Sequence, residues 1–235
     1  MPDFATIQAS VTLYASGVKF RNNRFLGYFL GEHPELFDGD PISLDQPEED
    51  NHGLRAILAS QDGLLRFYAY SSRVVIERFW DQRVGIDLSA HLNLASRLFG
   101  EYLDLMTPTP RHIICNVSRC CPDEAPARSL SRYFCRDEWL QGPIENPASF
   151  AIHVSKRYTL SGSLPVGSLF HCSSERLAIP ETQGESRSVV SVEQQIATIA
   201  EGLDRDQVGR FLATVTQEMD SILQLYFPSD EGARS

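Results

Sequence analysis

Three short β-rich runs separated by tight turns limit the folds open to this chain more than any other part of its sequence. The runs cover residues 54–60, 64–70 and 73–80, and the turns between them are Gln61-Asp62-Gly63 and Ser71-Ser72. An Asp-Gly pair between β-rich runs indicates a hairpin, because glycine tolerates a positive φ. The three runs therefore predict an antiparallel meander.

The segments around the meander predict a strand before it and a helix after it. Apolar and polar residues alternate over 6–14, which is the two-residue period of a half-buried strand. After the meander, apolar residues at three- and four-residue spacing predict a helix that starts at Asp87 or Ser89 and ends near Met106. A further strand is expected at 111–118.

The second half of the chain predicts more strands separated by loops. A short helix is expected around 130–140, within a loop region rich in proline and glycine. A strand follows at 150–158, and segments 168–173 and 175–179 are expected to form a hairpin.

Two consecutive helices are predicted at the C-terminal end. Ser191 and Gln194 have the spacing of a capping box, and they begin a stripe of apolar residues at helical spacing that reaches Leu203. Asp204 and Gln207 repeat that spacing at the start of a long amphipathic helix, which a proline ends.

Tight turns between neighbouring strands favour antiparallel pairing, and the helices are too few for repeated βαβ crossovers. We therefore expect an α+β fold, mainly an antiparallel sheet packed with one central helix and long C-terminal helices. The expected organisation is a single domain over residues 1–235. Two sub-halves, about 1–118 and 119–235, are the alternative, because each runs from strands to a helix.

Charge is unevenly distributed along the chain. The 21 basic and 31 acidic residues give a net charge of −10, and eight of the acids lie between Glu32 and Asp50, a segment without Lys or Arg that is expected to be a loop. A body of that sign repels a phosphate backbone, so nucleic acid is not an expected partner. Nucleic-acid binding would require the basic side chains to gather on one side of the surface. The arginines available for such a surface are Arg111, Arg119, Arg128, Arg132 and Arg136.

The sequence also indicates a compartment. Its apolar stretches are too short to cross a membrane, and its first residues contain an acid and no basic residue, unlike a secretory signal. We expect a cytoplasmic protein without membrane contact. The five cysteines are an odd number and two are adjacent, so they are expected to be reduced thiols.

Motifs for nucleotide, redox or hydrolytic chemistry are missing from the sequence. Neither lysine follows a glycine-rich turn, no glycine triplet opens a helix after a strand, and no Gly-x-Ser-x-Gly elbow occurs. We therefore expect no cofactor, and no catalytic or metal-binding residue is assigned. An enzyme would need a composite site gathered from the predicted strands, with the candidates His112, Cys115, His153, His171 and Cys172.

Four pieces of sequence occur in an order that is characteristic when taken together. They are the run 36–41, the hairpin 58–63, Arg73, and the pattern Phe150-x-x-His153-x-x-Lys156-x-Tyr158. In this order they resemble a sporadically distributed family of bacterial proteins of unknown function, and the resemblance covers most of the chain from residue 4 to 158. It implies a cytoplasmic accessory protein, carried on mobile elements or near defence systems, and it transfers no active site.

Two functions are therefore open. The first is a non-catalytic protein-interaction or accessory protein, immunity-like or antitoxin-like, whose negative charge would steer a basic protein partner. Its expected interaction surface consists of Asp38, Asp40, Asp45, Glu48, Glu49, Asp50 and Arg73. The second is an enzyme, for example a hydrolase, with the composite site named above.

Overall fold

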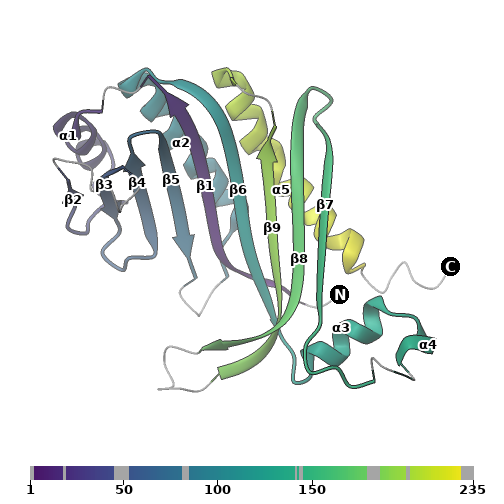
Figure 1. The fold of residues 1–235 in the computed structure, drawn as a ribbon. Helices are drawn as coiled ribbons and strands as arrows, with labels where there is room; N and C mark the ends of the chain where they lie inside the picture. Colours follow the sequence, from purple (N-terminus) through teal and green to yellow (C-terminus); the bar gives the residue numbers. More distant parts are fainter. Residues whose placement is uncertain are drawn as a thin grey trace.

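A computed structural model describes residues 3–17, 20–44, 53–80, 85–140, 142, 145–178, 186–199 and 202–228. In this part of the chain one antiparallel sheet of nine strands has the order β2-β3-β4-β5-β1-β6-β9-β8-β7 (Figure 1). The strands are β1 (Ala5–Ser16), β2 (Ile42–Ser43), β3 (Leu54–Ala59), β4 (Leu65–Tyr70), β5 (Arg73–Phe79), β6 (Thr109–Pro122), β7 (Ala151–Leu160), β8 (Leu164–Ala178) and β9 (Ser186–Thr198). The helices are α1 (Asn22–Glu32), α2 (Leu88–Met106), α3 (Pro126–Phe134), α4 (Asp137–Leu140) and α5 (Arg205–Tyr226).

The predicted meander is confirmed as β3, β4 and β5. Gly63 has a φ of +69°, and the carboxylate of Asp62 accepts a hydrogen bond of 2.9 Å from the backbone N–H of Leu64. These two residues close the first turn, as an Asp-Gly pair is expected to do. The α+β class is confirmed with it.

Both long helices begin at the predicted caps. Asp87 accepts a hydrogen bond from the N–H of Ala90 at the start of α2. Asp204 and Gln207 form a reciprocal capping box at the start of α5, with bonds of 2.7 and 2.8 Å. The two helices pack against each other and against the same side of the sheet.

The helix predicted from Ser191 is wrong, because these residues belong to strand β9. Gln194 does not cap a helix; it is buried, accepts a hydrogen bond of 2.9 Å from Arg119 and donates one of 2.7 Å to the backbone of Met219 in α5. β9 pairs with β8 along its length and with β6 over residues 189–197, so most of its backbone N–H and C=O groups are hydrogen-bonded within the sheet. Of the long C-terminal helices that the sequence predicts, the described residues form one, α5.

The hairpin predicted from 168–173 and 175–179 is also wrong in its position. Residues 164–178 form one continuous strand, β8, and its tight turn lies before it, at Ser161 and Gly162. Both turn residues have positive φ, +50° and +74°. The hairpin therefore joins β7 to β8.

The two halves of the sheet share one topology. The first half has the order strand, helix, three strands, helix (β1, α1, β3, β4, β5, α2), with β2 inserted, and the second repeats it (β6, α3, β7, β8, β9, α5), with α4 inserted. The strand orders β1-β5-β4-β3 and β6-β9-β8-β7 also correspond. Since β1 and β6 pair antiparallel, an approximate twofold rotation relates the halves. They meet at 107–108, whereas a boundary at 118 would cut β6.

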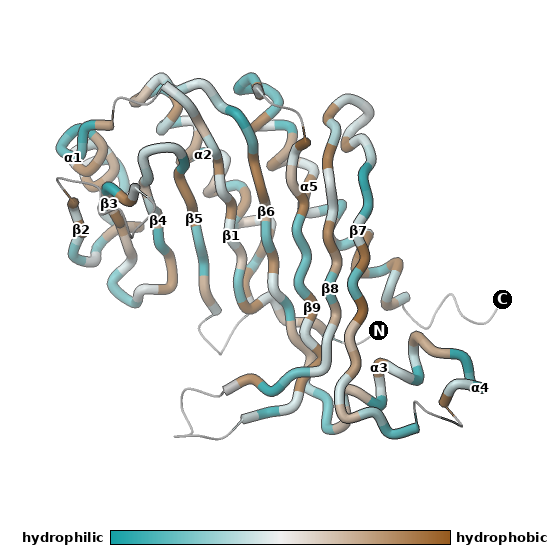
Figure 2. The backbone as a smooth tube through the Cα atoms, viewed as in Figure 1, coloured by the Kyte–Doolittle hydropathy of each residue, from teal (hydrophilic) through white to brown (hydrophobic). Residues whose placement is uncertain are grey.

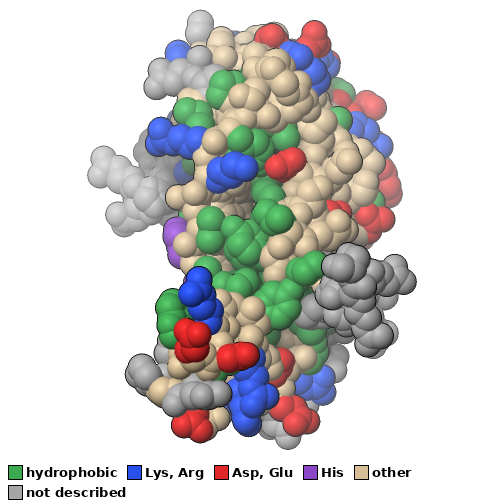
Figure 3. Space-filling view, turned by 90° about the vertical axis from the view of Figure 1, so that its right-hand side faces the viewer, with side chains coloured by type: hydrophobic (Ala, Val, Ile, Leu, Met, Phe, Trp, Pro, Cys, Tyr) green, Lys and Arg blue, Asp and Glu red, His purple; other side chains and the backbone are tan. Residues whose placement is uncertain are grey.

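The sheet ends in two unlike edges. One edge is β2, a strand of two residues, and the other is β7, a strand of ten residues. Along β7, the hydrophobic residues of its first part give way to the hydrophilic run Ser155-Lys156-Arg157 (Figure 2). On this side of the molecule, hydrophobic side chains gather in a hollow with charged groups around it (Figure 3).

Candidate functional site

One face of the sheet carries no helix from the described part of the chain. Core-facing residues such as Val11, Phe67 and Ile196 are fully buried beneath the helices, and in Figure 1 α2 and α5 lie behind the strands. The alternate residues of the same strands face the other way and are mostly half-buried. We call this second surface the open face.

Aromatic rings and one guanidinium form a continuous band across the open face. Arg73 lies 4.4 Å from the ring centre of Tyr70 and 5.9 Å from that of Tyr14. Tyr70 stacks beside Tyr68 at 6.3 Å, and Tyr14 lies 5.7 Å from the ring of His112. These five residues, which we call the tyrosine–arginine band, span the adjacent strands β4, β5, β1 and β6.

Next to the band, polar side chains bond to one another across the centre of the sheet. Gln195 donates a hydrogen bond of 2.7 Å to Asn116, and Asn116 donates one of 3.4 Å to Ser10. Gln8 donates one of 2.7 Å to the carboxylate of Glu77. These bonds satisfy the polar groups among themselves, so the centre of the open face is a hydrogen-bonded surface with fixed side chains.

Two histidines predicted as site candidates lie side by side on the open face. The register places His153 of β7 opposite His171 of β8, with ring centres 6.1 Å apart. Glu193 of β9 continues this row, with its carboxylate 3.6 Å from Nδ1 of His171. His112 lies six residues along β6 from Ser118, which faces Glu193, or about 20 Å at the rise of a strand.

The two candidate cysteines are on the other side of the sheet. Cys115 and Cys172 are fully buried in the core, and burial raises the pKa of each thiol to about 12. A thiol with such a pKa is protonated near neutral pH and is a poor nucleophile and ligand. The five residues of the predicted composite site therefore do not meet; only His153 and His171 do.

The predicted interaction surface is divided in the same way. Asp38 accepts a hydrogen bond of 2.6 Å from the backbone of Gln61 and so holds its loop against the β3–β4 turn. Arg73 lies beyond the opposite end of β4, and Asp40 is exposed. The remaining four acids, Asp45, Glu48, Glu49 and Asp50, lie outside the described residues.

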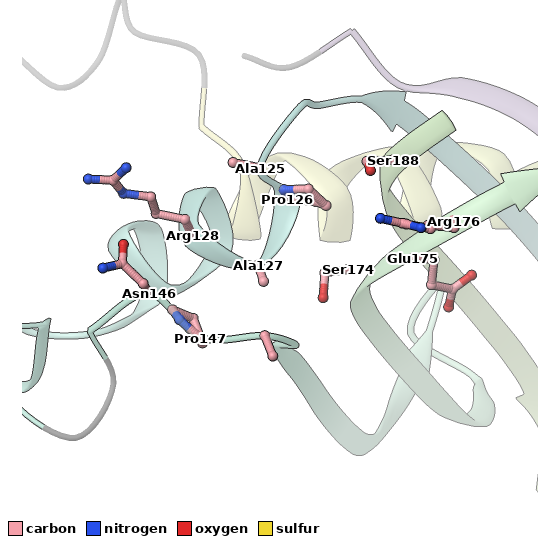
Figure 4. A pocket seen from close by; sticks show the side chains of 11 residues that line it. Ala125, Pro126, Ala127, Arg128, Asn146, Pro147, Ser174, Glu175, Arg176 and Ser188 are labelled. Atoms are coloured by element: carbon pink, nitrogen blue, oxygen red, sulfur yellow. The ribbon is translucent and has the colours of Figure 1, made fainter. Parts of the chain in front are cut away.

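A depression of about 520 Å³ lies at the start of α3 (Figure 4). Arg176 points into it, whereas the side chains of Arg128 and Glu175 point away from its centre. Its described lining contains neither a histidine nor a cysteine. It therefore offers one inward cation and no pair of reacting groups.

The tyrosines of the band were not predicted as functional residues. In β4, Phe67 and Ala69 alternate with Tyr68 and Tyr70, so either set could have faced the core. A tyrosine suits both a core and a surface, because its ring is apolar and its hydroxyl polar. The alternation showed that two faces exist, and only the position of the helices shows which face stays open.

Within the described ranges, no three His, Cys, Asp or Glu side chains are placed to hold a metal ion. No helix of the described residues has the length and apolar character needed to cross a membrane. Comparison of the chain with protein-family models gives no match, and comparison with curated proteins gives none either.

Proposed function

We propose that this chain is a non-catalytic protein-interaction or accessory protein and that the tyrosine–arginine band is its contact surface. The observation that carries the proposal is the position of the band. It lies at one end of four adjacent strands of the open face, beside the turn between β4 and β5, so a partner can contact the sheet there without meeting a helix.

The composition of the band suits protein contact. Tyrosine and arginine are enriched among residues that dominate binding energy, because both bury a large surface and keep a polar group. Arg73 is already held between the rings of Tyr14 and Tyr70, so it loses little rotamer freedom when a partner covers it.

The remaining chemistry does not favour an enzyme. The buried cysteines are protonated, and among the described residues the one ion-pair partner of the histidine pair is Glu193. Polar side chains at the centre of the open face are hydrogen-bonded to one another. A surface of this kind supports recognition better than bond cleavage.

The wider role follows from the sequence resemblance and from charge. We place the protein in the cytoplasm, as an immunity-like or antitoxin-like accessory of a mobile element or defence system. The acidic segment 32–50 would attract a basic region of the partner, which is a protein and not a nucleic acid.

Co-purification with charge variants tests this function. The tagged wild type, Arg73→Glu and Arg97→Glu are purified from the native host, the last being a control with the same charge change on the exposed side of α2. We expect a stoichiometric protein with the wild type and the control, and at least about tenfold less of it with Arg73→Glu. Recovery of no such protein, or its full retention by Arg73→Glu, refutes the proposal.

A further inference from the structure

The free edge of β7 is a second surface that this structure leaves uncovered. β7 pairs with β8 on one side, and no strand of the described residues pairs with its other side. An edge strand offers unpaired N–H and C=O groups to another chain, and natural sheets usually shorten such edges or interrupt them with proline. The opposite edge, β2, is shortened to two residues, whereas β7 has ten residues and no proline.

A groove runs along this edge, between β7 and α5. Its volume is about 240 Å³, and it is the hollow at the centre of Figure 3. Its apolar lining residues come from both elements and from β8 between them: Val154, Tyr158, Phe170, Ile222, Leu225 and Tyr226. Leu225 is 76% exposed, which is costly for a large apolar side chain unless something covers it.

The groove contains one cation and one anion. Lys156 lies 5.5 Å from the ring centre of Tyr158, and burial, together with the nearby Glu218 carboxylate, raises the pKa of the Tyr158 hydroxyl. Lys156 and Glu218 both line this groove. A surface with both charges is complementary to itself under a twofold rotation, because each lysine can face the other copy's glutamate.

We propose that β7 pairs antiparallel with β7 of a second copy of this chain, which closes the groove and joins two sheets into one. Residues that pair across two strands must point to the same face of the sheet. The twofold axis therefore lies beside one residue of β7, which faces either the open face or the face covered by the helices. An axis at Ser155 sets Val154 opposite Lys156 and Ile152 opposite Tyr158 of the second copy. An axis at Lys156 would set two lysines opposite each other, which is unfavourable.

The molecule already contains a junction of this type. β1 and β6 are equivalent strands of the two halves, and they pair antiparallel along their length to join one half to the other. The β7 contact repeats this arrangement between two chains. It uses a different surface from the tyrosine–arginine band, so it does not depend on the proposed function.

The oligomeric state of charge variants tests the dimer. The wild type is expected to be a dimer by sedimentation and light scattering. Lys156→Glu and Glu218→Lys each place like charges across both ends of the contact, so each is expected to raise the dimer dissociation constant at least about tenfold. Mixing the two variants restores both ion pairs and is expected to restore a dimer of one copy of each. Arg97→Glu and Glu35→Lys are the exposed controls.

Several results would overturn the proposal: a wild type that stays monomeric up to about 100 µM, single variants that dimerise like the wild type, or a mixture that stays monomeric. Misfolding of a variant is detected by its unfolding midpoint, and hydrogen exchange of the wild type provides a test without substitution. Amides on the outer edge of β7 are expected to exchange more slowly at dimer-forming concentrations than on dilution. Equal exchange at both concentrations would show that another molecule, or none, covers this edge.

Discussion

Lowering the pH from 7 to 5 should destabilise this protein through one buried histidine. His91, in the first turn of α2, has no exposed surface, and neither of its ring nitrogens has a hydrogen-bond partner. Burial lowers the pKa of His91 from its ordinary value of 6.5 to about 4, and the nearby charge of Arg78 acts in the same direction. The folded protein therefore holds this ring neutral.

The sign and size of the effect follow from the two pKa values. Between pH 6.5 and 4 the unfolded chain binds a proton at His91 that the folded chain does not, so the free energy of unfolding falls as the pH falls. The gap of about 2.5 pH units corresponds to about 3 kcal/mol at 1.36 kcal/mol per unit, and about 2 kcal/mol of this is lost between pH 7 and pH 5. Above pH 6.5 the full stability is present.

Urea unfolding of the wild type and His91→Leu at the two pH values isolates this contribution. Leucine has a similar volume and no polar group to bury, so the variant should be at least as stable as the wild type at pH 7. Other titrating groups act alike in both proteins. The stability difference between the two proteins should therefore change by about 2 kcal/mol between pH 7 and pH 5. An unchanged difference would refute the assignment of the pH dependence to His91.

Two further predictions concern the core and the cap of α5. In the native protein at pH 8, a thiol reagent should modify Cys121 and Cys135 well before the buried Cys115 and Cys172, which should react only on unfolding; equal rates would contradict the burial argument. Asp204→Ala should lower the free energy of unfolding by about 1 kcal/mol because it removes the carboxylate that accepts the hydrogen bond from the N–H of Gln207, and urea unfolding that shows no loss would contradict this.

Local signals in the sequence predicted the elements whose limits are set locally. The Asp62-Gly63 turn, the Asp87 cap and the capping box at Asp204 each involve residues within a few positions of one another, and each forms as expected. The α+β class followed from these elements. α1 has no such signal, since Arg21 at its N-cap makes no side-chain hydrogen bond, and tertiary contacts of Phe25 hold it against the sheet.

The misplaced elements depend on distant residues. Nothing near Gln194 shows that its segment will pair with β6, where its hydrogen-bond partner Arg119 lies 75 positions earlier. His153 and His171 meet because β7 and β8 form a hairpin whose turn was predicted elsewhere in the sequence. The tyrosine–arginine band forms because Tyr14 of β1 pairs with the distant Arg73 of β5. Strand pairing over such distances leaves no local trace in a sequence.

The repeated topology makes each half dependent on the other. A chain that stopped after α2 would leave β1, a strand of twelve residues, bare along one whole side, and a chain that began at β6 would do the same with its first strand. Such long bare strands attract other chains and promote aggregation. Because both halves belong to one polypeptide, β1 and β6 are always present together. Each strand covers the bare side of the other as soon as both halves have been synthesised.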